Sequence, residues 1–246
     1  MTWTTPGGKY YKLYADMANQ THLLIGGAAG SGKSVTINAI VTTILHDAPA
    51  EDELVLIDPK RVELSEYRNL PHVRMYASEP ADILDALRRT LQTIDARYKT
   101  MQRNGQREFT GSHLYLIIDE LTDLLTTASI KREAAELIQR ICQIGRAARC
   151  HCIAGTQHIP TVPTSIRCNF DARLALRTTC AQDSRNIAGV KGAETLPSPR
   201  LTGKAYGYYR NAEGIALYEL PTYTEAEHRR IVDHWRQYTR FTWATA

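Results

Sequence analysis

A glycine-rich segment that ends in a lysine and a serine is the part of this sequence with the clearest chemistry. Residues 27–34 fit the pattern G-x-x-x-x-G-K-[ST] and directly follow the apolar run 22–26. Glycines let such a loop fold tightly around a β-phosphate, with backbone N–H groups pointing inward. Lys33 then reaches the β- and γ-phosphates of ATP or GTP, and the Ser34 hydroxyl takes a place on Mg²⁺. The predicted nucleotide-binding residues are Gly27, Ala28, Ala29, Gly30, Ser31, Gly32, Lys33, Ser34 and Val35.

A pair of adjacent carboxylates supplies the second half of the predicted site. Asp119 and Glu120 end the apolar run that begins at His113, which is a Walker B pattern. Asp119 is predicted to hold Mg²⁺, and Glu120 to polarise the attacking water. The alternative for Glu120 is a carboxylate that only stabilises a helix N-terminus. A protein that merely binds nucleotide does not need Glu120, so the pair favours hydrolysis.

Strands that alternate with helices are predicted to position these groups. Such an order gives an α/β fold with a mainly parallel sheet covered on both faces. The chain ends in a predicted hairpin and a helix that a Thr224–Glu227 capping box opens. Ser78 is predicted to cap the helix that starts near Pro80. The predicted strands are near 22–26, 53–58, 72–76, 113–119, 150–154, 172–177, 205–209 and 214–218, and the helices near 34–45, 80–98, 133–148 and 224–235.

Composition sets limits on the class of protein. The chain has 246 residues, 43% of them hydrophobic, and a net charge of +4 that many enzymes share. This length suits a single α/β domain over residues 1–246, with a core at about 20–210 and the hairpin and helix at about 205–238. The sequence offers no membrane-spanning run or signal pattern, so a cytoplasmic location is expected. The five cysteines are expected to be buried thiols in a reducing compartment.

The run Asp58-Pro59-Lys60-Arg-Val-Glu63-Leu64 and several further motifs resemble those of the FtsK/SpoIIIE family of DNA translocases. This run is the most discriminating of the motifs, since many P-loop families share the Walker A segment. The resemblance implies a RecA-like ATPase that uses ATP and Mg²⁺. It also implies that copies of the chain assemble into a ring, usually a hexamer, which pumps double-stranded DNA. The similar motifs are residues 56–72, 97–101, 119–124, 145–148, 156–157 and 183–185.

The resemblance also suggests roles for three polar residues. Gln157 would sense the γ-phosphate, the alternative being an ordinary polar group of a loop. A ring ATPase needs a cation from the neighbouring subunit to neutralise transition-state charge. Arg185 is the preferred arginine finger. Arg146 is the second candidate, although at the end of helix 133–148 it could simply offset the helix dipole.

Two loops are candidates for DNA contact, because a translocase holds phosphates without reading bases. One carries Arg103 and Arg107, and the other carries Thr164 and Arg167; the alternative for each is an ordinary solvated surface. Tyrosines at 206, 208 and 209 alternate along a predicted strand, which favours packing against the sheet over base stacking.

Departures from the family pattern affect the expected domain content and source of the protein. The chain is too short for the membrane helices, linker and winged-helix module that family members commonly carry. His158 replaces a usual arginine, and the segment between Met101 and His113 is short. The expected protein is a minimal motor, standing alone or excised from a longer chain, with a phage, plasmid or conjugative element as a possible source. The alternatives are a protein-export ATPase similar to those of type VII secretion, which the Asp58–Leu64 run disfavours, and a non-hydrolysing nucleotide switch.

Overall fold

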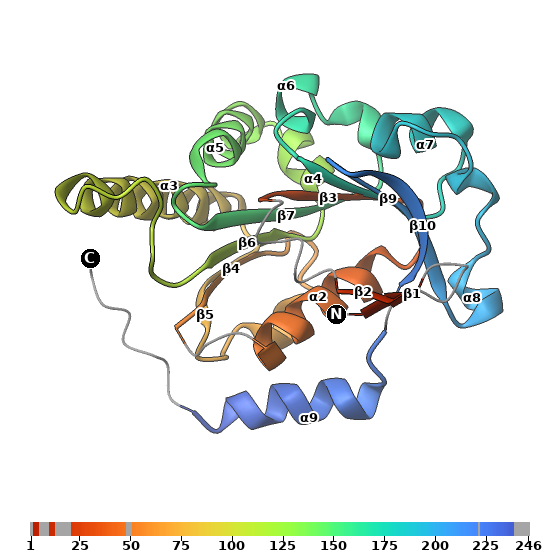
Figure 1. Ribbon diagram of the computed structural model, residues 1–246, viewed down its shortest axis with the longest axis horizontal. Coiled ribbons are helices and arrows are strands. Elements are labelled where there is room, and N and C mark those ends of the chain that lie inside the picture. Colours follow the sequence, from red (N-terminus) through yellow and green to blue (C-terminus); the bar gives the residue numbers. More distant parts are fainter. Residues whose placement is uncertain (1, 5–9, 13–20, 48–50, 221, 239–246) are drawn as a thin grey trace.

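The computed structural model describes residues 2–4, 10–12, 21–47, 51–220 and 222–238, which form a ten-stranded sheet with helices on both faces (Figure 1). The strand order is β2-β1-β10-β9-β8-β3-β7-β6-β4-β5. The strands are β1 (Thr2–Thr4), β2 (Tyr10–Lys12), β3 (Leu23–Gly26), β4 (Glu53–Ile57), β5 (Val73–Ala77), β6 (Leu114–Ile118), β7 (Cys150–Thr156), β8 (Ala172–Ala175), β9 (Ala205–Asn211) and β10 (Gly214–Leu220). The helices are α2 (Lys33–Asp47), α3 (Pro80–Arg103), α4 (Leu121–Thr126), α5 (Lys131–Ile144), α6 (Thr164–Arg167), α7 (Ala181–Ala188), α8 (Pro199–Thr202) and α9 (Glu225–Arg236), with 3₁₀ turns η1 (Ser65–Tyr67), η2 (Ile159–Thr161) and η3 (Ala193–Thr195).

The strands that carry the predicted nucleotide site run parallel at the centre of the sheet. β3 lies between β8 and β7, and β6 lies between β7 and β4. Every residue of β3, β4, β6 and β7 is buried, as expected for parallel strands covered on both faces. Parallel neighbours end at the same edge of a sheet, so the loops after these strands meet there. The predicted mainly parallel α/β fold is confirmed.

Alternate residues of the central strands build two separate hydrophobic cores. Along β3, Leu24 belongs to one core, whereas Leu23 and Ile25 belong to the other. In β6, Tyr115 and Ile117 share the core of Leu23. Figure 1 shows the layers that cover these cores: α3, α5, α6 and α7 lie on one face of the sheet, and α2 and α9 on the other. Successive side chains of a strand point to opposite faces of the sheet. Each apolar run therefore contributes residues to both cores.

Two helix ends differ from the sequence prediction. Helix α3 has Glu79 rather than Ser78 at its N-cap. Helix α5 ends at Ile144 and not at residue 148. The chain turns back into β7 at that point, because the Gly145 carbonyl accepts hydrogen bonds from Ala148 N at 3.0 Å and Cys150 N at 2.9 Å. Arg146 therefore lies in this turn, and the prediction that it ends a helix is wrong.

The C-terminal hairpin is confirmed, and it extends the sheet further than its sequence indicates. β9 pairs antiparallel with both β8 and β10, and β10 also pairs with β1. The Asn211 side-chain oxygen closes the turn by accepting hydrogen bonds from Glu213 N and Gly214 N. Tyr209 is buried against Tyr218, and Tyr206 and Tyr208 pack against the other core. The tyrosines therefore pack the sheet.

Helix α9 begins with the predicted capping box and packs on α2. Glu227 N donates to Thr224 Oγ1 at 3.2 Å, and Thr224 N donates to a Glu227 carboxylate oxygen at 2.8 Å. At the other end of α9, Trp235 Nε1 donates to Leu45 O at 2.7 Å. None of the described helices combines the length and the apolar character that a membrane crossing requires.

The cysteines agree only in part with the expectation of buried thiols. Cys142, Cys150 and Cys152 are buried, but Cys168 and Cys180 are exposed. Burial raises the pKa of the Cys150 thiol, so it stays protonated at neutral pH. The described ranges hold no group of three or more His, Cys, Asp or Glu side chains arranged to bind a metal.

Candidate nucleotide-binding and hydrolysis site

The glycine-rich loop lies at the carboxyl end of β3 and leads into α2. Gly30 and Gly32 have φ angles of +72° and +95°, in the left-handed region that glycine adopts without strain. Two backbone hydrogen bonds fix the loop to the neighbouring strands: Gly27 N donates to Thr156 O at 3.2 Å, and Ala28 N donates to Arg177 O at 2.9 Å. The loop thus has the conformation that the sequence predicts for phosphate binding.

A cavity of about 490 Å³ opens above this loop. Of the predicted nucleotide-binding residues, Gly27 and Ser31 are not part of the lining, and the Ser31 side chain is buried beneath the loop. Pro199 and Arg200 of α8 form part of the opposite wall. The lining residues are Ala28, Ala29, Gly30, Gly32, Lys33, Ser34, Val35, Glu63, Gln157, Pro199, Arg200, Gly203, Ala205 and Thr222.

Lys33 contacts both predicted Walker B carboxylates. Its Nζ donates to the Asp119 backbone oxygen at 2.7 Å and to Asp119 Oδ1 at 3.2 Å. The same Nζ lies 3.4 Å from Glu120 Oε2. All three side chains are at most 6% exposed, so these opposite charges interact with little solvent screening. The structure therefore brings together the residues to which the sequence assigned phosphate, metal and water.

Gly155 of β7 permits this close arrangement. β7 lies between β3 and β6, so the Lys33 side chain passes the β7 backbone at Gly155 on its way to Asp119. A Cβ atom at position 155 would lie 2.3 Å from Asp119 O and 3.1 Å from Lys33 Cδ. These distances leave no space for a side chain, and the first contact is with backbone, which cannot swing aside.

We expect Gly155→Ala to destabilise the protein by about 1–3 kcal/mol, because one added methyl group overpacks this contact. Chemical denaturation of the two proteins measures the difference. Nucleotide affinity should fall as well, since the methyl group pushes Lys33 from its position. Equal stability together with unchanged affinity would show that the Asp119 backbone moves freely.

Glu120 has two differently placed carboxylate oxygens. Oε1 accepts a hydrogen bond from Gln157 N at 3.0 Å, whereas Oε2 accepts none from the described residues and faces Lys33. Glu120 does occupy the N-cap of α4, but its side chain makes no capping hydrogen bond there. Its carboxylate points instead into the site, which favours the chemical interpretation over that of a simple helix cap.

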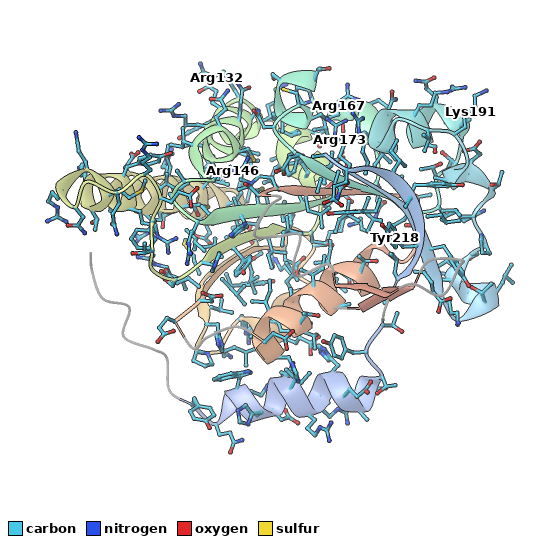
Figure 2. The ribbon with its side chains drawn as sticks, in the orientation of Figure 1. Arg132, Arg146, Arg167, Arg173, Lys191 and Tyr218 are labelled. Atoms are coloured by element: carbon cyan, nitrogen blue, oxygen red, sulfur yellow. The ribbon has the colours of Figure 1, made fainter. Side chains whose placement is uncertain are left out.

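The two arginine-finger candidates lie away from this cavity. Arg185 is exposed on α7, where its Nη1 donates to Gln182 Oε1 of the same helix at 3.3 Å. Arg146 is exposed in the turn after α5 and is marked in Figure 2. Neither belongs to the lining of the cavity.

The four candidate DNA contacts fall on two separate segments. Arg103 ends α3, and Arg107 follows in the exposed loop that leads to the amino end of β6. Thr164 and Arg167 lie on α6, where Arg167 Nη2 donates to Thr164 Oγ1 at 3.0 Å. Figure 2 shows Arg167 on the face that also carries Arg132. The nucleotide site lies at the carboxyl edge of the sheet, so Arg103 and Arg107 do not contribute to it.

Sequence reasoning missed the far wall of the cavity. Pro199 and Arg200 lie long after the glycine-rich loop in sequence, yet a Cβ on Gly32 would lie 3.4 Å from Pro199 Cγ. A Cβ on Gly30 would lie 3.7 Å from Arg200 Nε. A cation beside the loop is chemically suited to phosphate, but no spacing rule connects it with the Walker motifs. Only the return of the chain into β9 places α8 there.

Comparison with known proteins finds relatives of this chain. A model of the FtsK/SpoIIIE family matches residues 6–115. The DNA translocase FtsK of Chlorobaculum tepidum is 37% identical over 204 residues, which cover 74% of this chain and 25% of that protein. FtsK of Staphylococcus aureus is 36% identical over 198 residues, covering 71% of this chain and 25% of that protein. The chain thus spans about a quarter of the length of these curated relatives.

Solved structures show the same fold at lower identity. The cytoplasmic domain of the type VII secretion ATPase EccC from Thermomonospora curvata aligns with a TM-score of 0.75 and 20% identity, over 97% of this chain and 31% of that one. The pCW3 conjugation coupling protein TcpA, solved with ATPγS, aligns with a TM-score of 0.77 and 17% identity, over 95% of this chain and 70% of that one.

The fold, with Lys33 of the glycine-rich loop beside Asp119 and Glu120, is that of the P-loop class with a RecA-like architecture. Within that class, the relatives at 36–37% identity and the family model identify the branch. The chain belongs to the FtsK/SpoIIIE family.

Proposed function

We propose that this chain is the motor of an ATP-driven translocase that moves along double-stranded DNA. The observation that carries the proposal is the buried contact of Lys33 with Asp119 and Glu120 in a chain whose relatives are DNA translocases. This cluster provides for hydrolysis, and the relatives suggest the substrate. We further propose that residues 1–246 act as one motor domain, working in the cytoplasm, where ATP and DNA are both available.

The proposed chemistry assigns one task to each group. Lys33 would leave the carboxylates for the β- and γ-phosphates of ATP, and Ser34 and Asp119 would hold Mg²⁺, which neutralises the phosphate charge. Glu120 would orient the attacking water and accept its proton. The Gln157 side chain, which lines the cavity, would contact the γ-phosphate. The residues present fit the metal, since a hydroxyl and a carboxylate are the oxygen ligands that Mg²⁺ prefers.

The experiment that tests this function compares the effects of possible substrates on ATP hydrolysis. We expect linear duplex DNA to raise the ATPase rate several-fold, and the stimulation to weaken with added salt because phosphate contacts release counterions. Single-stranded DNA of equal nucleotide concentration is the control. The likeness to EccC favours one other candidate, protein export. Stimulation by an exported peptide, with none by duplex DNA, would establish export and exclude the DNA motor.

We also propose that the motor works as a ring, usually hexameric in this family, with one arginine of each subunit completing its neighbour's site. Arg185 is the preferred finger and Arg146 the alternative; the exposure of both, outside their own cavity, supports action between subunits. A phage, plasmid or conjugative element is the proposed source. The proposed DNA contacts are Arg103, Arg107, Thr164 and Arg167.

Mixing two inactive variants tests the finger. Arg185→Ala and Glu120→Gln should each abolish most hydrolysis, but mixed rings should recover activity, because some interfaces then pair an intact Glu120 with an intact Arg185. The loss should reach about 10³-fold or more in Arg185→Ala and about 10²- to 10⁴-fold in Glu120→Gln. Steady-state ATPase across mixing ratios measures the recovery. Dead mixtures despite confirmed co-assembly would refute Arg185, and recovery only with Arg146→Ala would make Arg146 the finger.

A further inference from the structure

A second lysine approaches the proposed catalytic glutamate from the solvent side. Lys60, in the loop after β4, places its Nζ 3.9 Å from Glu120 Oε2 and 3.7 Å from Asp123 Oδ2 of α4. The Lys60 side chain is 45% exposed, whereas that of Glu120 is 2% exposed. Lys60 thus lies over a buried carboxylate whose other cationic neighbour in the described part of the chain is Lys33.

The loop that carries Lys60 is held firmly at both ends. Asp58 is fully buried, and its Oδ2 accepts hydrogen bonds from Leu64 N at 3.0 Å and from the Tyr76 hydroxyl at 3.4 Å. Arg61 N donates to Asp58 O at 3.1 Å, with Arg61 in the left-handed region at φ +59°. Leu64 is itself part of a hydrophobic core. Because these contacts close the turn, the backbone at Lys60 has a defined position relative to β6 and α4.

Burial also affects the pKa of Tyr76, whose hydroxyl donates to Asp58. Burial, followed by the neighbouring Asp58 carboxylate, raises the pKa of Tyr76 above its usual value. Tyr76 therefore remains a protonated donor to Asp58 throughout the neutral range. The turn that presents Lys60 is thus closed by a hydrogen bond whose Tyr76 donor keeps its proton.

Nucleotide binding changes the charge balance around Glu120. Without nucleotide, the Asp119 and Glu120 carboxylates share the single Lys33 ammonium group. A bound triphosphate attracts Lys33, and a buried carboxylate that loses its cation is strongly destabilised unless another group compensates it. Gln157 N already holds Oε1, while Oε2 has no hydrogen bond from the described residues. Lys60 is placed to compensate that second oxygen.

We propose that Lys60 is a positioning residue, which holds the Glu120 carboxylate in its working orientation while Lys33 is engaged by the phosphates. The inference rests on the proposed role of Glu120 as the group that orients water. Two anchors, Gln157 N on Oε1 and Lys60 on Oε2, fix both the location and the rotation of the carboxylate. Asp123 keeps Lys60 close to this position through the second ion pair.

Lys60→Ala should therefore slow single-turnover ATP hydrolysis by about 10- to 100-fold. Without Lys60 the Glu120 carboxylate shifts slightly, and the water that it orients is then poorly placed for attack. The dissociation constant for ATP should change less than twofold, since Lys60 is not part of the cavity lining. Lys60→Arg should recover most of the rate. Lys131→Ala, at an exposed lysine on α5, is the control for loss of a positive charge.

A double substitution separates this role from DNA contact or subunit contact. If Lys60 acts through Glu120, Lys60→Ala should cause no further loss in a Glu120→Gln background. A full additional loss there, or a weakened affinity for duplex DNA with normal single-turnover hydrolysis, would overturn the inference. Near-normal hydrolysis by Glu120→Gln alone would instead refute the proposed role of Glu120. An inactive Glu120→Gln together with a fully active Lys60→Ala would refute the role of Lys60 alone.

Discussion

Lys33→Ala is expected to weaken ATP binding by about 100-fold or more and to abolish turnover. Lys33 is the cation at the floor of the cavity, and each hydrogen bond from a charged donor to phosphate contributes about 1.5–3 kcal/mol. Loss of the contacts to the β- and γ-phosphates therefore corresponds to at least two orders of magnitude in affinity. Equilibrium titration with a fluorescent ATP analogue measures the affinity, and phosphate release measures turnover.

The same substitution also tests the buried charge cluster. Without Lys33, the Asp119 and Glu120 carboxylates lose a cation that lies within 3.2 and 3.4 Å. Removing one partner of a buried ion pair lowers the free energy of unfolding by about 3–5 kcal/mol. The variant should therefore also unfold at a lower denaturant concentration. Circular dichroism establishes the denaturant concentrations at which the Lys33→Ala protein is folded, and Lys131→Ala is the control. A folded Lys33→Ala protein with normal affinity and turnover would exclude the P-loop ATPase assignment of this site.

Glu120→Gln should leave ATP bound and slow its hydrolysis by about 10²- to 10⁴-fold, the usual contribution of a positioned general base. Glutamine retains the shape of the side chain and can still accept the hydrogen bond from Gln157 N, but it cannot take a proton from water. Rapid-quench measurement of one turnover, with protein in excess over ATP, separates the chemical step from product release.

Glu136→Gln provides the matched control, because Glu136 is exposed on α5 and undergoes the same chemical change. It should hydrolyse ATP at the normal rate. Loss of ATP affinity in Glu120→Gln, with a normal rate for the ATP that does bind, would show that Glu120 serves binding and not hydrolysis. Together with the Lys60 variants, this comparison distinguishes the glutamate from the lysine that is proposed to hold it.

The sequence alone predicted the features that depend on local backbone preference and periodicity. Gly30 and Gly32 have the positive φ angles that their motif requires, and Thr224 and Glu227 form the predicted capping box. The apolar runs around Ile25 and Ile117 became buried parallel strands. Such features are readable because they are determined by a few consecutive residues, whose conformational limits hold whatever packs against them.

The tertiary structure decided which of these parts are neighbours. β7 lies between β3 and β6, so Gly155 became the position where any side chain would separate Lys33 from Asp119. Lys60, in the loop after β4, and Arg200, on α8, lie beside the site although both are distant from the glycine-rich loop in sequence. Helix α5 ended at Ile144 because the chain had to turn into β7, although its pattern continued. Strand order and such long-range contacts depend on how the whole chain packs its two cores, and no local pattern contains that information.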